Sequence, residues 1–186
     1  MKYRETIETK DLILRKAVIE DAEKIYNNYW KHEETAKYMN WSTCKNLEEA
    51  NERLGKAIEF QIGKPAYFVY EKLTNEPIGM AGVKEVDDGV YEDAGIGIGP
   101  KFVGKGYGKQ ILNCLIDYVF IELNGKKLIC SCNSENIPSA RLQQACGLKF
   151  THREKTTRKK DGLEYMSEYY EIDRPLYEAI RKVKES

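Results

Sequence analysis

The beginning of the chain combines one short apolar run with two segments in which apolar side chains recur at helical spacing. Residues 12–15 are apolar up to a closing arginine and predict a strand. Residues 19–30 carry apolar side chains three and four positions apart, which is typical of one face of a helix. Asn46 and Glu49 resemble a capping box, so a second helix is expected over residues 46–61.

The middle of the chain reads as three strands joined by tight turns. Residues 66–71, 77–86 and 91–98 are the three strand-like segments, and turn-forming residues separate them at 74–76 and 87–89. Turns this short join neighbouring antiparallel strands. The pattern therefore predicts an antiparallel meander.

An amphipathic segment over residues 106–122 follows, with its apolar side chains on one helix face. The short apolar run at 127–132 is then typical of a buried strand. A strand, a helix and another strand in this order imply a parallel pair with a right-handed crossover. Together with the meander, this order predicts a mixed α+β fold.

The last part of the chain reads as a hairpin and a helix. Strands are expected at residues 148–155 and 164–172, on either side of an Asp-Gly turn at 161–162. We interpret the basic run at 157–160 as a solvated part of this turn. Asp173 is in position to cap a final helix.

Charge and length narrow the classes of function. Lysine and arginine total 30 and are balanced by 30 aspartate and glutamate residues, so the formal net charge is 0. No global positive field favours DNA, RNA or an anionic membrane, which argues against a nucleic-acid adaptor. The chain has 186 residues without an internal repeat or a flexible linker, and we expect a single domain over residues 1–186.

The cysteine and histidine content argues against disulfides and metal sites. The five cysteines are an odd number without the spacing of a disulfide framework, so they are interpreted as buried thiols in a reducing compartment. His32 and His152 lie far apart in the sequence, and no metal is expected. The absence of a bilayer-spanning apolar run or an apolar secretion signal predicts a cytoplasmic protein.

A glycine-rich turn precedes the amphipathic helix, with glycines at positions 104, 106 and 108. The spacing does not fit G-x-G-x-x-G, and Lys109 is followed by Gln110 where a Walker loop needs serine or threonine. The unpaired N–H groups at a helix start attract phosphate, and glycine lets the backbone approach it closely. The turn therefore predicts an anion-binding loop.

Three motifs together carry a resemblance to a known family. Residues 103–108 fit Q/R-x-x-G-x-G/A, with valine at the first position. Residues 136–150 fit N-x-x-S/A-x-x-L followed by a glycine and a closing phenylalanine, and residues 9–15 fit T-x-R-L-x-L-R with aspartate at the third position. On these motifs the chain resembles the Gcn5-related N-acetyltransferases (GNAT), in particular the RimJ/RimL-like branch, over nearly its full length.

The resemblance implies a central mixed, mostly antiparallel sheet of about seven strands, flanked by helices and with one splayed parallel pair. Acetyl-coenzyme A would be the co-substrate, its pantetheine arm lying between strands at 94–98 and 128–132. Glycines at 95, 97 and 99 would either let that arm approach or make room for packing. The implied cofactor-binding residues are Gly97, Ile98, Val103, Gly104, Lys105, Gly106, Tyr107, Gly108, Lys109, Asn136 and Ser139.

The implied reaction is direct attack of a neutral primary amine on the thioester in a ternary complex. The amine must first lose a proton, and Asp93 and Glu92 are candidate bases, although acids beside a turn are often only solvated. Gln143 stands where many family members have a tyrosine acid. Ser139 is therefore the candidate proton donor, with helix capping or packing as its alternative role. Asn136 is expected to orient cofactor amides or a water molecule.

The aromatic region at residues 26–41 is expected to form the rim over the acceptor, with Tyr38 and Trp41 as candidate contacts. An aromatic rim suits a peptide amino terminus or a small-molecule amine without choosing between them. The leading hypothesis is an acetyl-coenzyme A dependent N-acetyltransferase, either a monomer or a homodimer. The alternative, motivated by Val103 and Gln143, is a catalytically silent coenzyme A binding module.

Overall fold

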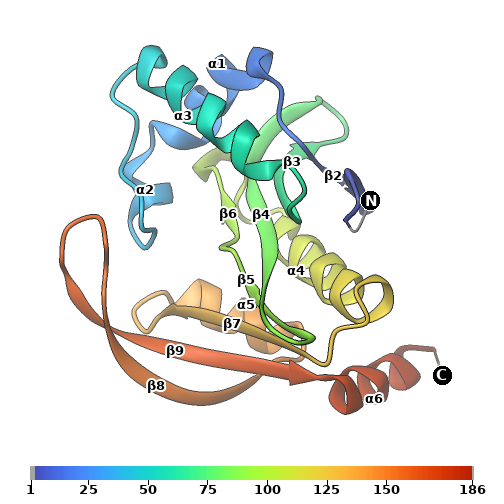
Figure 1. Cartoon of the computed structure of the whole chain (residues 1–186). Helices are drawn as coiled ribbons and strands as arrows, with labels where there is room; N and C mark the ends of the chain where they lie inside the picture. Colours follow the sequence, from blue (N-terminus) through green and yellow to red (C-terminus); the bar gives the residue numbers. More distant parts are fainter. Residues whose placement is uncertain (1–2, 186) are drawn as a thin grey trace.

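The computed structural model describes residues 3–185, which form a nine-stranded mixed sheet with helices on both faces (Figure 1). The strands are β1 (Thr6–Glu8), β2 (Leu12–Arg15), β3 (Ala66–Glu71), β4 (Glu76–Asp87), β5 (Val90–Asp93), β6 (Gly97–Ile98), β7 (Lys127–Asn133), β8 (Lys149–Thr157) and β9 (Glu164–Asp173). Their order across the sheet is β1-β2-β3-β4-β5-β7-β9-β8, and β6 also pairs with β4.

Helices connect the strands in the order that the sequence predicts. They are α1 (Ala22–Ile25), α2 (Glu33–Ala36), α3 (Leu47–Gln61), α4 (Tyr107–Asp117), α5 (Ile137–Ala145) and α6 (Arg174–Glu185). Short 3-10 turns cover Ile19–Asp21 and Pro100–Phe102, and π-helical turns cover Tyr26–Trp30 and Tyr118–Glu122. Among the described residues, no helix is both long enough and apolar enough to cross a lipid bilayer.

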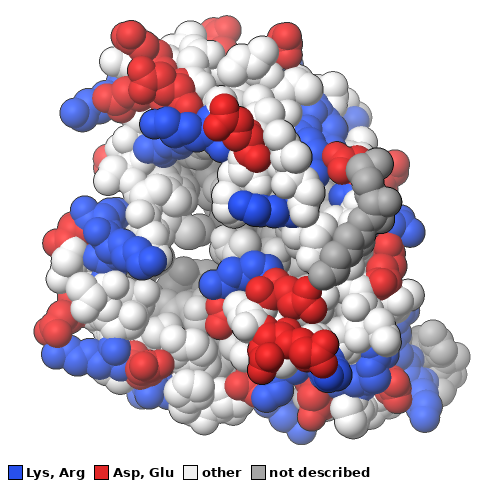
Figure 2. Space-filling model, viewed as in Figure 1, with Lys and Arg blue, Asp and Glu red and all other residues white. Residues whose placement is uncertain are grey.

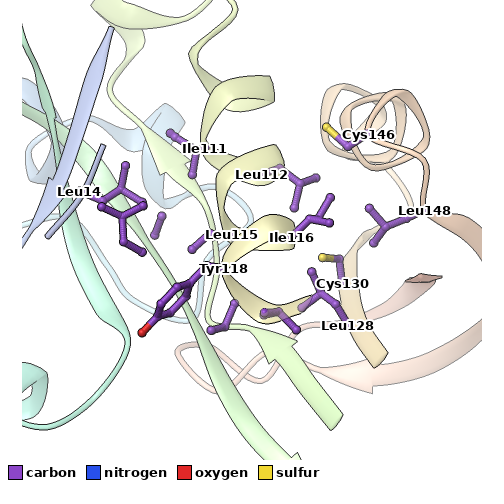
Figure 3. Close-up of a cluster of buried hydrophobic side chains, with 14 of the residues drawn as sticks. Leu14, Ile111, Leu112, Leu115, Ile116, Tyr118, Leu128, Cys130, Cys146 and Leu148 are labelled. Atoms are coloured by element: carbon purple, nitrogen blue, oxygen red, sulfur yellow. The ribbon is translucent and has the colours of Figure 1, made fainter. Parts of the chain in front are cut away.

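Both faces of the sheet are covered, because successive side chains of a strand point to opposite faces. In β3, Tyr67 and Val69 belong to one buried cluster together with the apolar face of α4. Figure 3 shows Ile111, Leu112, Leu115 and Ile116 of α4 in this cluster. Phe68 and Tyr70 belong to a second cluster together with residues of α1 and α3. The sheet is therefore held between two helical layers, with α4 on one side and α1 to α3 on the other.

The sheet opens at its only parallel pair among the described strands. β5 pairs with β7 over Val90–Glu92 and Lys127–Ile129. Beyond this point Gly95 takes a φ of +91°, and the chain returns to pair with β4 as β6, whereas β7 continues beside β9. In Figure 1, β4 and β6 lie in the upper half of the molecule, whereas β7 and β9 run across the lower half. Neither edge of the resulting gap is covered by a neighbouring strand.

The observed elements confirm the predicted fold, but one predicted strand is wrong. The parallel pair is present, but the segment at 91–98 is not one strand. It breaks into β5 and β6, because the left-handed turn at Gly95 interrupts the ladder. This break and the short β1 bring the sheet to nine strands where about seven were expected.

Helix ends follow the predicted capping chemistry. Asn46 Oδ1 accepts a hydrogen bond from Glu49 N at 2.9 Å, and Asp173 Oδ1 accepts one from Leu176 N at 2.9 Å. Gly147, just past α5, has a φ of +96°, as expected of a left-handed cap. The helix predicted over 19–30 is helical throughout but changes type twice, from 3-10 to α to π.

Candidate active site

The gap between β6 and β7 is the centre of a cleft of about 700 Å³. In the same view as Figure 1, Figure 2 shows the molecule hollowed between its upper and lower parts. The cleft brings together residues from the sheet, the start of α4, the start of α5 and the region before α3. Of the sequence-predicted site residues, those lining it are Tyr38, Trp41, Glu92, Asp93, Ile98, Gly108, Asn136 and Ser139.

The glycine-rich turn lies where α4 begins, and its last glycine, Gly108, lines the cleft. Gly104 and Gly106 have φ values of +81° and +77°, a left-handed conformation that favours glycine. A Cβ atom added at either position would meet nothing within 4 Å, so both residues border open space. The first N–H groups of α4 have no partner within the helix. The turn and helix start therefore form an open cradle for an anion, and the 61% exposed Val103 does not fill it.

Two predicted cofactor contacts point their side chains elsewhere. Tyr107 Oη donates a hydrogen bond to Glu71 Oε1 at 2.6 Å, and Lys105 Nζ lies 3.1 Å from the same oxygen. Thr74 donates to the other carboxylate oxygen of Glu71. These bonds, that from Tyr107 foremost, lower the pKa of the Glu71 carboxyl. Glu71, which sequence reasoning missed, thus anchors the glycine-rich turn to the end of β3.

The start of α5 forms a second wall of the cleft. Asn136 caps the helix by accepting a hydrogen bond from Ser139 N at 3.3 Å. Ser139 Oγ accepts a hydrogen bond from Gln143 Nε2 at 3.2 Å. Burial raises the pKa of the neighbouring Cys132 thiol to about 11, although hydrogen bonds with Ser139 and Gln143 act in the opposite direction. Cys132 is therefore a neutral thiol at physiological pH, and a poor nucleophile.

The two candidate bases lie in different environments. Burial raises the pKa of the Asp93 carboxyl to about 7, and the charge of Glu92 adds to this, against a hydrogen bond from the Ser131 backbone. Glu92 is 35% exposed and lies 2.8 Å from Lys84 Nζ in a salt bridge. A carboxyl with a pKa near 7 can accept a proton at neutral pH and release it again. The two candidate bases thus differ in that Asp93 has a raised pKa and Glu92 is held in a salt bridge.

The glycines along β6 make room for the helical region of the opposite layer. A Cβ at Gly97 would lie 1.8 Å from Tyr29 Oη, and one at Gly99 would lie 1.9 Å from Asn28 O. The packing interpretation of these two glycines is therefore supported. Tyr29 itself lines the cleft although it is only 1% exposed. Sequence reasoning included Tyr29 in the aromatic region at 26–41 but did not select it as a site residue.

Replacing Gly97 by alanine is expected to lower the free energy of unfolding by about 1–3 kcal/mol, because the new Cβ overlaps the Tyr29 hydroxyl. Chemical denaturation measures this loss. Gly55→Ala in α3 is the matched control, since a Cβ there meets nothing within 4 Å. In a Tyr29→Phe background the loss should shrink, because the nearest ring atom would then be Cζ at 2.8 Å. An equal loss in both backgrounds would contradict this packing account.

Residues 36–41, which we call the arch, span the cleft on the side of α1 to α3. On one side, Tyr38 Oη donates a hydrogen bond to Glu135 O at 3.3 Å, next to the start of α5. On the other side, Lys160 Nζ donates to Ala36 O at 2.5 Å and to Trp41 O at 3.3 Å. The arch thus joins the two sides of the cleft through Tyr38 and Lys160.

The β8–β9 hairpin reaches across the molecule to the arch (Figure 1). Arg158 Nη1 donates to Lys37 O, and Lys159 N donates to Asn40 Oδ1 at 3.1 Å. The Arg158 side chain is only 14% exposed and also pairs with Asp161. The predicted hairpin turn is present and Lys159 is exposed, but the turn is only partly solvated, because Arg158 and Lys160 bind backbone carbonyls of the arch.

Comparisons with known proteins agree with this arrangement. A family model described as an acetyltransferase (GNAT) domain matches residues 11–149. The uncharacterized N-acetyltransferase p20 of Bacillus licheniformis is 30% identical over 141 residues, which cover 74% of this chain and 79% of that protein.

Two solved structures share the fold. The crystal structure of a GNAT family acetyltransferase from Bacillus anthracis has a TM-score of 0.78 at 22% identity, covering 90% of this chain and 98% of that one. The spermidine N-acetyltransferase from Vibrio cholerae, in complex with CoA and spermine, has a TM-score of 0.72 at 22% identity and covers 91% and 99% of the two chains. Among the described residues, no group of three or more His, Cys, Asp or Glu side chains could hold a metal ion.

Proposed function

The chain belongs to the acetyltransferase (GNAT) family, and from that membership we propose that it transfers the acetyl group of acetyl-coenzyme A to a primary amine. The family resemblance expected from the sequence is thereby confirmed. We also propose the RimJ/RimL-like branch, on the motif at residues 9–15. The observation that carries the proposed function is the glycine cradle, because the helix that begins there places Gly108 in the lining of the cleft between β6 and β7.

The residues of the cradle fit the diphosphate of coenzyme A. Gly104 and Gly106 leave open space in front of the turn, and the N–H groups at the start of α4 supply donors without a side chain. Lys109 is exposed nearby, whereas the Lys105 ammonium is bound to Glu71. We therefore assign the diphosphate contacts to backbone from residue 103 to 108, with Lys109 as the available cation. Bound in this way, acetyl-coenzyme A supplies the activated thioester.

We assign the proton transfers to two residues of the cleft. Asp93 takes a proton from the amine, for which its raised pKa suits it. Ser139 Oγ donates a proton to the departing thiolate and takes up in turn the second proton that the attacking nitrogen loses as the amide forms. Direct attack by the amine is favoured over an acyl-enzyme, because Cys132 stays protonated at neutral pH. Holding both reactants in one cleft supplies much of the rate by proximity.

Thiol release from acetyl-coenzyme A tests the proposal. The panel should include small amines and peptides that begin with alanine or serine. Turnover with any of them supports the enzyme. Coenzyme A binding without turnover across the panel would favour the second candidate, a catalytically silent coenzyme A binding module. The observation that favours this candidate is Gln143, whose amide lies beside Ser139 and supplies no hydroxyl acid.

Ser139→Ala is expected to lower kcat by about tenfold to a hundredfold while changing the affinity for coenzyme A much less, because a proton donor acts only during the chemical step. Steady-state kinetics and calorimetry measure the two effects. Ser167→Ala is the matched control, since Ser167 lines the same cleft and bonds only weakly to Cys132 O at 3.4 Å. Unchanged kinetics in Ser139→Ala would show that the hydroxyl only supports the helix.

A further inference from the structure

Tyr29 lines the cleft, and its buried hydroxyl has no hydrogen-bond partner among the described residues. The ring packs in the cluster between the sheet and α3, and the residue is 1% exposed. A buried hydroxyl without a partner lowers the stability of a fold, so most buried polar atoms are paired. A second molecule in the cleft would supply the missing partner.

The hydroxyl faces the side of β6 opposite the glycine cradle. Successive positions of β6 point to opposite faces. Gly97 faces Tyr29, whereas the Ile98 side chain lies toward Gly108 at the start of α4. A thioester delivered from the cradle therefore reaches the gap from one face of the sheet. Tyr29 lies on the other face, where the second substrate has to enter.

Aromatic side chains that are held in place surround this second face. The rings of Tyr29 and Trp41 lie 5.3 Å apart between centroids. The Arg53 guanidinium lies 5.6 Å from the Trp41 ring, and Arg53 Nη2 donates to Ser42 O at 2.7 Å. Lys160 holds the Trp41 carbonyl. Tyr29 Oη thus belongs to a side chain that packs against aromatic neighbours held in place.

The attack of the amine determines which kind of hydrogen bond Tyr29 Oη can form with it. A neutral amine uses its lone pair to attack the carbonyl carbon, so only its N–H bonds remain for contacts with the protein. Those N–H bonds require hydrogen-bond acceptors. A phenolic oxygen is one, and burial raises the pKa of Tyr29, so the group stays neutral.

We propose that Tyr29 Oη accepts a hydrogen bond from the acceptor nitrogen and positions it for attack, and that the acceptor is a monoamine on an apolar or aromatic body. This inference rests on the proposed function. The monoamine follows from the charges, because the acidic residues among the described cleft residues are Asp93 and Glu92, and Glu92 is paired with Lys84. The additional ammonium groups of a polyamine would have no free carboxylate there.

The test compares Tyr29→Phe with the unmodified full chain, using phenethylamine as the monoamine probe and spermine as the polyamine probe. Calorimetry measures phenethylamine binding to the complex of protein and coenzyme A, in which no transfer occurs. We expect binding and acceptor kcat/KM to fall by about tenfold, while affinity for coenzyme A stays within about twofold. The thermal midpoint should rise, because the variant removes an unpaired buried hydroxyl.

Tyr70→Phe is the matched control. Tyr70 is fully buried in the same cluster, but its hydroxyl donates to Asp21 Oδ2 at 2.5 Å. This variant should lower the thermal midpoint and leave acceptor use unchanged. Loss of activity together with a raised thermal midpoint in Tyr29→Phe would therefore indicate a substrate contact. A residue with only a packing role would not give this combination.

The outcomes separate this inference from the proposed function. Equal phenethylamine affinity in Tyr29→Phe and the unmodified protein, including no binding to either, overturns the assignment of Tyr29. Loss of coenzyme A affinity in the variant also overturns it, since the hydroxyl would then bind the cofactor. Better use of spermine than phenethylamine overturns the monoamine class. Absence of transfer to every amine overturns the proposed function, even where Tyr29 still governs phenethylamine binding.

Discussion

Replacing Gly106 by glutamate is expected to abolish binding of coenzyme A while leaving the fold intact. Gly106 borders open space at the start of α4, so the new carboxylate would occupy the cradle assigned to the diphosphate. Two like charges about 4 Å apart repel by about 4 kcal/mol near a protein surface, which corresponds to roughly a thousandfold in affinity. Calorimetry with coenzyme A measures the loss, and circular dichroism checks the fold.

A control at a second glycine, Gly63, distinguishes the effect of charge repulsion from that of backbone strain. Gly63 has a φ of +65° and open space around its Cβ position, and it lies after α3, away from the cleft. Gly63→Glu therefore carries a similar left-handed strain of about 1–2 kcal/mol without touching the cradle. Normal coenzyme A affinity in Gly63→Glu and none in Gly106→Glu supports the assignment. Unchanged affinity in Gly106→Glu would refute it.

Asp93→Asn is expected to lower kcat/KM at pH 7 by on the order of a hundredfold or more, because the amide cannot accept the proton of the amine. In the unmodified protein the rate should rise with pH through about 7, the pKa of Asp93, since the base acts only when it is deprotonated. The variant should lose this rise. Glu92→Gln is the control and should keep this rise but move it to lower pH, because Glu92 is paired with Lys84 and its charge helps to raise the pKa of Asp93.

The same carboxyl also predicts how stability depends on pH. The pKa of Asp93 is higher in the fold than in the unfolded chain, so the folded state binds more protons between about pH 4 and 7. The contribution of Asp93 to the free energy of unfolding therefore falls as pH rises through this window. Asp93→Asn removes that contribution. Chemical denaturation at pH 5 and pH 8 should show that the variant gains stability relative to the unmodified protein at the higher pH.

The order of elements and the cradle could be predicted from the sequence because both depend on local signals. Apolar spacing predicted the helices and strands. Asn46 and Asp173 were predicted to cap helices, which their side chains do through hydrogen bonds to backbone N–H groups three positions along the chain. The glycine-rich turn is likewise a local feature. These parts of the fold could be predicted without knowing which distant residues are in contact.

The parts that could not be predicted depend on contacts between distant segments. The role of Glu71 could not be predicted, because its partners Tyr107 and Lys105 lie some thirty-five positions away in the sequence. The break between β5 and β6 depends on the turn at Gly95, which a run of apolar residues conceals. Arg158 and Lys160 of the hairpin bind backbone carbonyls of the arch. Every residue has a backbone carbonyl, so the sequence could not indicate which of them these cations bind.

The arch also links the cleft to a distant part of the chain. Tyr38 Oη bonds to Glu135 O, and Lys160 Nζ bonds to Ala36 O and Trp41 O, so residues far along the sequence hold both sides of the arch. A substitution of Lys160, near the tip of the β8–β9 hairpin, would therefore act on residues that line the cleft, Trp41 among them.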